Sequence, residues 1–130
     1  MTTLGYLDSS AIVKLVLVEA GSTAMLRWYV EAERIVTSQV GVIETHRVAA
    51  RRQHDPARLV EVLEMLEVFE LDDDVGRRAE QVAPPALRTL DAIHIATALA
   101  IGPTLDAFVT YDDRQAEAAR AAGLKVVRPA

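Results

Sequence analysis

Short apolar runs alternate with helical patterns along the whole chain. The apolar runs predict strands, the third of them weakly, at residues 4–7, 34–37, 68–71, 105–111 and 124–127. The segments between them predict helices over residues 10–17, 21–33, 39–53, 56–66, 72–83, 87–102 and 112–123. Strands that alternate with helices favour an α/β fold of three α/β/α layers, whose central parallel sheet has about four to five strands.

Residues at the helix ends support these boundaries. Ser38 and Thr89 are expected N-caps, and Asp55 should cap a helix whose first position is Pro56. Gly123 is expected to close the helix before the last strand. Because no repeat, linker or low-complexity segment interrupts the pattern, residues 1–130 are predicted to form a single domain.

Composition and charge narrow the class of protein. Hydrophobic residues make up 51% of the 130, enough for a core, and the absence of cysteine excludes a disulfide framework and a thiolate metal site. The chain has neither an apolar run of roughly 18 residues nor a signal-peptide pattern, so we expect a cytoplasmic protein with no membrane partner. A net charge of −5 argues against a binder with one large basic surface, but not against an enzyme that meets nucleic acid through acid-bound cations.

Four acidic residues lie where ligand-binding side chains gather in α/β folds. Asp8 directly follows the first predicted strand and Asp112 follows the fourth, and the carboxyl ends of such strands border the usual ligand crevice. Asp91 lies in the first turn of a helix that is otherwise apolar on nearly every side. Glu44 interrupts a stripe of valines, at i, i+4 and i+8, that should point inward.

Each of these acids also has an ordinary structural explanation. Asp8 could cap the helix after it, as could Asp112 or the adjacent Asp113. Asp91 could complement the dipole of its helix, and Glu44 could pair with an arginine of its own helix. Several carboxylates around one crevice would nevertheless repel one another unless a cation lay among them. Such oxygen ligands suit Mg²⁺ or Mn²⁺, and an ion held in this way can promote phosphodiester hydrolysis.

Basic side chains cluster on the predicted helix that carries Glu44. Arg47 or Arg51 could pair with Glu44, and the cluster as a whole is either a solvated helix face or a contact for RNA phosphates. Its members are Arg47, Arg51 and Arg52, with His46 and His54 beside them. His94 lies one helical turn after Asp91 and is expected to be a core histidine with satisfied hydrogen bonds.

No competing catalytic motif is present. The glycines are too far apart for a dinucleotide-binding or P-loop motif, and neither H-E-x-x-H nor G-x-S-x-G occurs. A phosphoacceptor receiver domain would also place an acid at a strand end. Such a domain would need paired acids after the first strand, where this chain has Asp8 alone, and a lysine before the last strand, whereas Lys125 lies within it.

Four segments, taken in chain order, resemble one known family. They are YLDSSAIVKL, VIETHRVAAR, LRTLDAIHIATAL and FVTYDDRQAEAARAAGLKVVRP, and the likeness extends over nearly the whole chain. They resemble the PIN-domain ribonucleases and, among these, the VapC-type toxins of bacterial toxin–antitoxin pairs. The resemblance implies a PIN-like sheet between helices, an acidic pocket for Mg²⁺ or Mn²⁺, and endonucleolytic cleavage of RNA that inhibits translation.

The resemblance also implies roles for individual residues. The principal metal ligands would be Asp8 and Asp91, while two further acids would bind directly or through water. The adjacent Asp113 could take the role implied for Asp112. The expected reaction is in-line attack by hydroxide, which leaves a 3′-hydroxyl and a 5′-phosphate. The matching positions are four acids and two hydroxyls beside the pocket: Asp8, Glu44, Asp91 and Asp112, with Ser10 and Thr110.

The same resemblance implies macromolecular partners. We expect a homodimer, an RNA substrate (tRNA, rRNA or mRNA), and a cognate VapB-type antitoxin whose C-terminal segment crosses the groove. Trp28, Tyr29 and Val30 lie on an early helix that could line this groove, although Trp28 could equally be ordinary core. The alternative function is that of a catalytically inactive PIN-like binding module, which metal-dependent RNA cleavage would exclude.

Overall fold

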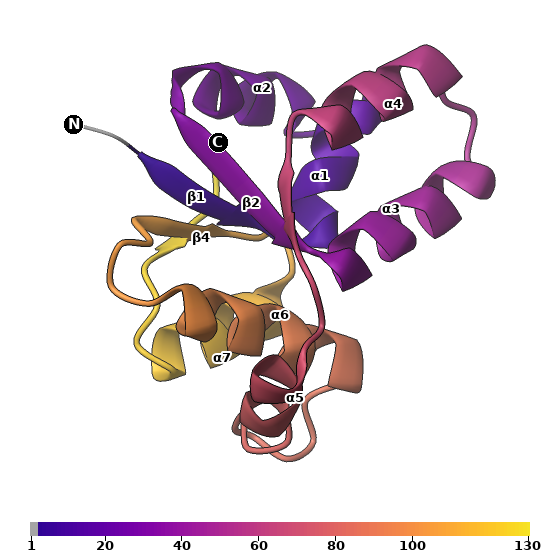
Figure 1. The fold of residues 1–130 in the computed structure, drawn as a ribbon. Coiled ribbons are helices and arrows are strands. Elements are labelled where there is room, and N and C mark those ends of the chain that lie inside the picture. Colours follow the sequence, from indigo (N-terminus) through magenta and orange to yellow (C-terminus); the bar gives the residue numbers. More distant parts are fainter. Residues whose placement is uncertain (1–2) are drawn as a thin grey trace.

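The computed structural model describes residues 3–130, which form a five-stranded sheet between two layers of helices (Figure 1). The strands run parallel in the order β3–β2–β1–β4–β5. The predicted α/β class and the parallel sheet are therefore confirmed. The strands are β1 (Leu4–Leu7), β2 (Arg34–Ser38), β3 (Glu67–Phe69), β4 (Ala107–Val109) and β5 (Val126–Val127).

The helices divide between the two faces of the sheet. They are α1 (Ser9–Val16), α2 (Ser22–Glu31), α3 (Gln39–Ala50), α4 (Pro56–Glu64), α5 (Asp73–Ala79), α6 (Thr89–Ile101) and α7 (Asp113–Ala121). Helices α1 to α4 lie on one side and α5 to α7 on the other (Figure 1). Within residues 3–130, no helix combines the length and the apolar character that crossing a membrane requires.

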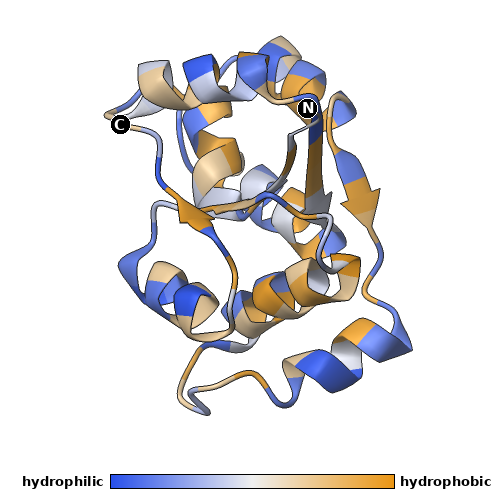
Figure 2. Ribbon diagram, turned by 90° about the vertical axis from the view of Figure 1, so that its left-hand side faces the viewer, coloured by the Kyte–Doolittle hydropathy of each residue, from blue (hydrophilic) through white to orange (hydrophobic). Residues whose placement is uncertain are grey.

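Alternating side chains of the strands build a core on each face of the sheet. Leu4 and Tyr6 of β1 face the layer of α6 and α7, where the Tyr6 ring stacks on Phe108 of β4 with centroids 5.2 Å apart. Leu7 faces the opposite way and belongs to the core under α1, α2 and α4. Helix α6 is hydrophobic along most of its length, as Figure 2 shows. Such a helix is expected to be buried all round, and its residues 92–98 are all buried.

Most of the expected helix caps are present, and one is not. The Ser38 side chain accepts a hydrogen bond from a backbone N–H of α3, and Asp55 caps α4 with Pro56 at the first position. Thr89 does not cap α6. Arg88 occupies that position without a side-chain cap, and Thr89 is already helical. The negative charge of Asp91 in the first turn suits this uncapped terminus.

Several elements are shorter than the sequence pattern predicts. The helix predicted over 39–53 ends at Ala50, the one over 72–83 ends at Ala79, and the strand over 105–111 pairs only across Ala107–Val109. The apolar pattern extends past two of these elements because Val82, Leu105 and Tyr111, which lie outside them, are packed against the core. Gly123 closes α7 as expected, with a φ of +91° that favours glycine.

Candidate active site

The order of the strands places two chain segments side by side at the carboxyl edge of the sheet. From β1 the chain builds outward through β2 and β3, and then crosses to the other side of β1 to add β4 and β5. The carboxyl ends of β1 and β4 therefore meet where the strand order reverses, which is where ligands bind in open α/β sheets. Asp8 follows β1 and Asp112 follows β4, so the topology brings these two predicted residues to one crevice.

Asp8 is a buried carboxylate held by hydrogen bonds on both oxygens. Its Oδ1 accepts from the Ser10 hydroxyl at 2.6 Å and from the Ala11 backbone N–H at 3.1 Å, and its Oδ2 accepts from the Thr110 hydroxyl. Burial raises the pKa of Asp8, while His94 and these hydrogen bonds act in the opposite direction. Asp8 is the N-cap of α1 as well, so its capping and pocket positions coincide.

The two predicted hydroxyl residues join the ends of β1 and β4. Ser10 Oγ lies 3.3 Å from Thr110 Oγ1 and accepts from the Tyr111 backbone N–H at 2.8 Å. Thr110 Oγ1 in turn accepts from the backbone N–H of Asp112 at 3.1 Å. The hydroxyls thus fix the Asp8 carboxylate and the loop that carries the neighbouring acid in one network.

Asp91 is half-buried in the first turn of α6. Burial raises its pKa most, the negative charges of Asp112 and Glu44 raise it further, and the positive charge of Arg88 lowers it. The Arg88 guanidinium is 3.8 Å away and largely exposed, so its compensation is weak. Three of the four predicted acids therefore influence one another electrostatically.

Glu44 is bound by a histidine and not by an arginine of its own helix. Its Oε1 lies 2.6 Å from Nε2 of His94, whose Nδ1 lies 2.6 Å from the Tyr6 hydroxyl. The alternative explanation, a pairing of Glu44 with Arg47 or Arg51, is therefore not borne out, because the side chain of Glu44 turns inward toward α6. His94 is 1% exposed with both ring nitrogens bonded, which confirms the expected satisfied core histidine.

The adjacent acids 112 and 113 are separated by the start of α7. Asp112 is the N-cap, and its Oδ1 accepts from the backbone N–H of Gln115 at 2.9 Å. The side chain of Asp113 is 91% exposed and pairs with Arg128 at 2.7 Å. Asp112, which also raises the pKa of Asp91, is therefore the member of the pair that belongs to the acidic side of the crevice.

The donor set fits a divalent cation in kind. It consists of carboxylates and hydroxyls, the oxygen ligands that Mg²⁺ and Mn²⁺ prefer, and ionised Asp91 and Asp8 are both disfavoured without a compensating charge. As the side chains stand, no group of three or more acidic or histidine side chains within residues 3–130 is gathered closely enough to hold an ion. An ion here would need water ligands or a small rearrangement of side chains, both of which suit Mg²⁺.

Comparison with known proteins settles the family. The PIN domain family matches residues 5–121, a span that contains all four acids. The chain belongs to the PIN-domain family.

Curated relatives place this PIN domain among the VapC ribonucleases. It is 41% identical over 130 residues to Ribonuclease VapC35 of Mycobacterium tuberculosis, with 95% of this chain and 96% of the relative covered. It is 40% identical over 126 residues to Ribonuclease VapC46 of the same species, with the same coverage. The resemblance seen in the four quoted segments is thereby confirmed, and the receiver-domain alternative is set aside.

Solved structures share the fold of this PIN domain. Mycobacterium tuberculosis VapC20, a Sarcin-Ricin loop cleaving toxin, superimposes with a TM-score of 0.74 at 21% identity, covering 96% of this chain and 99% of that one. VapBC2 from Rickettsia felis, bound to a DNA fragment from its promoter, gives 0.72 at 12% identity, with 97% and 98% covered. At these identities the likeness concerns architecture, and it supports the three-layer PIN-like fold.

The basic cluster of the PIN domain is only partly available for RNA. Arg47 and Arg51 are exposed, whereas Arg52 lies 3.2 Å from Glu19 in an ion pair. Arg47 in α3 and Arg51 at its C-cap are three and seven residues after Glu44, so they lie on nearly the same side of the helix. Arg47 and Arg51 are therefore better placed for a ligand at the acids than Arg52.

The aromatic residues of α2 have mixed positions. Trp28 is partly buried on the core, and a Cβ placed at Gly5 of β1 would lie 2.4 Å from its ring. Tyr29 also packs against this core, whereas Val30 is 71% exposed. Trp28 thus serves the packing of α2 on the sheet, which is the second of the two roles expected for it.

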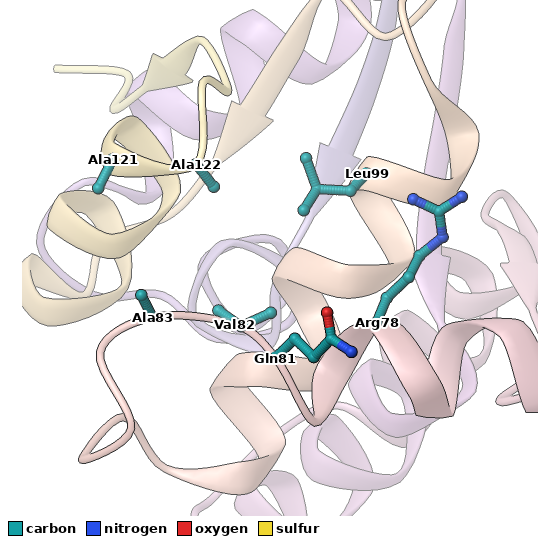
Figure 3. A pocket seen from close by; sticks show the side chains of 7 residues that line it. All are labelled: Arg78, Gln81, Val82, Ala83, Leu99, Ala121 and Ala122. Atoms are coloured by element: carbon teal, nitrogen blue, oxygen red, sulfur yellow. The ribbon is translucent and has the colours of Figure 1, made fainter.

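A pocket of about 360 Å³ lies apart from the predicted residues. Figure 3 shows it between the end of α5, α6 and α7. It is lined by Arg78, Gln81, Val82, Ala83, Leu99, Ala121 and Ala122. None of these side chains is acidic, and the charge of Arg78 is compensated by Asp74 at 3.0 Å. The pocket therefore offers no acidic side chain that could bind a metal ion.

The hydrogen-bonded chain from Glu44 through His94 to Tyr6 is not apparent from the sequence. His94 is correctly expected as a core residue, but its contact with Glu44 joins residues 50 positions apart, and Tyr6 is 88 positions from His94. The only local signal is Gly41, one turn before Glu44, where a Cβ would lie 2.3 Å from Thr37 Oγ1 and 3.2 Å from the His94 ring. A glycine inside a predicted helix can mark such a close approach.

Proposed function

We propose that this chain is a metal-dependent endoribonuclease toxin of the VapC type, which hydrolyses RNA phosphodiester bonds and so inhibits translation and growth. The observation that carries the proposal is that Asp8 and Asp112 follow β1 and β4 at the carboxyl edge of a PIN-domain sheet, where Asp112 and Glu44 act on Asp91, in a chain 41% identical to a VapC ribonuclease. Burial raises the pKa values of two of these acids, Asp8 and Asp91, and the charges of Asp112 and Glu44 add to the rise at Asp91, which a bound cation would offset.

Asp8 and Asp91 would be the principal metal ligands, with Glu44 and Asp112 acting directly or through water. The ion would be Mg²⁺ or Mn²⁺, which, when bound, supplies a Lewis acid for the scissile phosphate and lowers the pKa of the attacking water. Ser10 and Thr110 orient the Asp8 carboxylate through their hydroxyls. The expected products carry a 3′-hydroxyl and a 5′-phosphate.

Arg47 and Arg51 are proposed to hold RNA phosphates beside the acids. Both are exposed and follow Glu44 along one side of α3. Their positive charge would attract the RNA backbone toward a crevice that is otherwise acidic. Arg52 takes no part in this proposal, because Glu19 compensates its charge.

The proposed partners are a VapB-type antitoxin, which would neutralise the enzyme, and a second copy of the chain. Similar folds occur in solved assemblies that include VapBC2 from Rickettsia felis and VapBC-1 from nontypeable Haemophilus influenzae. The net charge of −5 makes this chain a poor binder of promoter DNA by itself. We therefore assign DNA contact to the antitoxin.

The decisive experiment is cleavage of total bacterial RNA by the purified chain. We expect new RNA ends bearing 5′-phosphates with Mg²⁺ or Mn²⁺, and none after chelation with EDTA. Asp91→Asn should reduce the rate by more than about 100-fold, because a ligand carboxylate becomes a neutral amide. Asp74→Asn, which alters an exposed acid of α5, serves as the matched control and should cleave normally.

Two results would contradict the proposal. Cleavage that persists in EDTA would exclude the metal mechanism. A folded wild-type protein that cuts no RNA with either metal would favour an inactive PIN-like binding module instead.

A further inference from the structure

A chain of hydrogen bonds crosses the core behind the candidate active site. It begins at the Tyr6 hydroxyl on β1, passes through the His94 ring on α6 and ends at Oε1 of Glu44 on α3. Both bonds are 2.6 Å long, and the Tyr6 and His94 side chains are almost completely buried. Three elements that are distant in sequence therefore meet at one imidazole ring.

The chemistry of the three groups fixes the direction of each hydrogen bond. An ionised carboxylate can only accept hydrogen bonds, so the N–H at Nε2 of His94 is the donor of the hydrogen bond to Glu44. The pKa of Tyr6 lies well above its usual 10.0, because its hydroxyl is buried and Asp8 is charged nearby, so the hydroxyl keeps its proton. When that hydroxyl donates to Nδ1 and Nε2 donates to Glu44, every polar group of the chain has a hydrogen-bond partner.

The backbone is shaped to permit this contact. Gly41 lies in α3 one turn before Glu44, and a Cβ there would lie 3.2 Å from the His94 ring and 2.3 Å from Thr37 Oγ1. The glycine thus allows α3 to approach α6 closely enough for the short Glu44–His94 bond.

We propose that His94 is a positioning residue: it holds one oxygen of Glu44 so that the other, Oε2, is presented to the divalent ion. The inference rests on the proposed function, since it concerns the ligand set of that same site. A glutamate side chain loses substantial rotamer freedom when it is ordered, and a partner that orders it beforehand removes this cost from ion binding. Tyr6 fixes the ring from its other side.

The test measures binding of Mn²⁺ alone to the RNA-free protein by calorimetry. We expect His94→Leu to weaken Mn²⁺ binding by about 10- to 100-fold, the usual effect of losing a partner that orients a metal ligand. His94→Gln can still donate an N–H to Glu44 and should recover most of the affinity. Tyr6→Phe removes a single hydroxyl from the chain and should weaken binding by a smaller factor.

A double-mutant cycle separates positioning from general stability. In a Glu44→Ala background, His94→Leu should cause no further loss of Mn²⁺ affinity, because His94 acts through that carboxylate. Thr45→Val is the control. It removes a fully buried hydroxyl next to Glu44 that bonds only within α3, so it should leave Mn²⁺ binding unchanged.

The outcomes separate the two proposals. If wild-type protein binds Mn²⁺ and folded His94→Leu binds it equally well, the positioning role is refuted and the metal site stands. If wild-type protein binds no Mn²⁺, the proposed function itself fails. Should His94→Leu not fold, the Mn²⁺ affinities of Tyr6→Phe and His94→Gln replace it in the test. In addition, nitrogen NMR of the wild-type His94 ring must show a proton on Nε2, and a proton on Nδ1 instead overturns the inference.

Discussion

At the scale of single residues, two acids of this PIN domain lie where their ionised forms are disfavoured. Asp8 caps α1 and is held by two hydroxyls, yet burial still raises its pKa. Asp91 has the favourable position in the first turn of α6, and its pKa is raised as well. Ionised carboxylates with raised pKa values destabilise the fold in which they occur, and such residues concentrate at functional sites.

The pH dependence of stability should reveal this cost at Asp91. Because the pKa of Asp91 in the fold lies above its usual 3.8, the folded state binds the proton more tightly than the unfolded state does. Its contribution therefore favours folding at low pH and is lost as the pH rises through the folded pKa. Asp91→Asn lacks this loss. We expect the variant to match wild type below about pH 4 and to unfold about 1 to 4 °C higher at neutral pH.

Thermal unfolding of both proteins across this pH range, without metal, checks the expectation. The difference between the two proteins reports the titration of Asp91 together with its coupling to Asp112 and Glu44. A variant that is less stable than wild type at neutral pH would mean that the helix dipole and Arg88 stabilise the carboxylate by more than burial destabilises it.

Two glycines in helices should respond oppositely to the same substitution. Gly41→Ala would place a methyl group against Thr37 and the His94 ring, so we expect a loss of about 1 to 3 kcal/mol in unfolding free energy, together with reduced activity. Gly76→Ala in α5 meets nothing within 4 Å and should gain about 0.5 to 1 kcal/mol from helix propensity. Denaturant unfolding measures both, and equal shifts of the same sign would contradict the packing argument.

At the scale of elements, α3 and α6 are joined by the hydrogen bond between Glu44 and His94. Helix α6 contributes Asp91 and, one turn later, His94, while α3 contributes Glu44 and the exposed Arg47. The i, i+3 spacing of Asp91 and His94 is visible in the sequence, as is the interruption of the apolar stripe by Glu44. That these two helices face each other at these positions depends on the crossover between β3 and β4, which no local pattern encodes.

The exposed arginines of α3 should govern RNA affinity and not the chemical step. Arg47→Ala and Arg51→Ala are each expected to weaken RNA binding several-fold and to reduce the salt dependence of binding by about one unit in the logarithmic slope. The rate at saturating RNA should change little. Fluorescence anisotropy with a labelled RNA at several salt concentrations, on the metal-free protein, measures the RNA affinity and its salt dependence. A cleavage assay with Mn²⁺ measures the rate at saturating RNA.

The control for this series is Arg34→Ala, at the amino end of β2, where the arginine pairs with Glu67 at 3.0 Å. It removes the same charge from the opposite edge of the sheet and should leave the salt slope unchanged. If all three variants lose affinity equally, the effect reflects net charge, and α3 is not the RNA contact.

At the scale of the whole molecule, a cation should stabilise the folded chain. The acids come from β1, α3, α6 and the start of α7, and an ion among them would connect both helical layers with the sheet. With Mn²⁺ at about 100 times its dissociation constant, linkage predicts a gain of about 2.7 kcal/mol in wild type. Asp91→Asn should gain far less. Thermal unfolding with and without Mn²⁺ checks this, and an equal gain in both proteins would place the ion elsewhere.

The sequence by itself determined the alternation of elements, the burial of the central strands β1 and β4, and the places of the acids along the chain. The covering expected on both faces of the sheet does not extend to β3, whose residues are exposed. These properties arise from local periodicity and from residue types next to strand ends, which neighbouring residues encode. It could not show the true cap of α6, the short pairing of β4, the choice between Asp112 and Asp113, or the partner of Glu44. Those features depend on which elements are packed together, and the contacts between residues 50 or more positions apart exist only once the sheet has assembled.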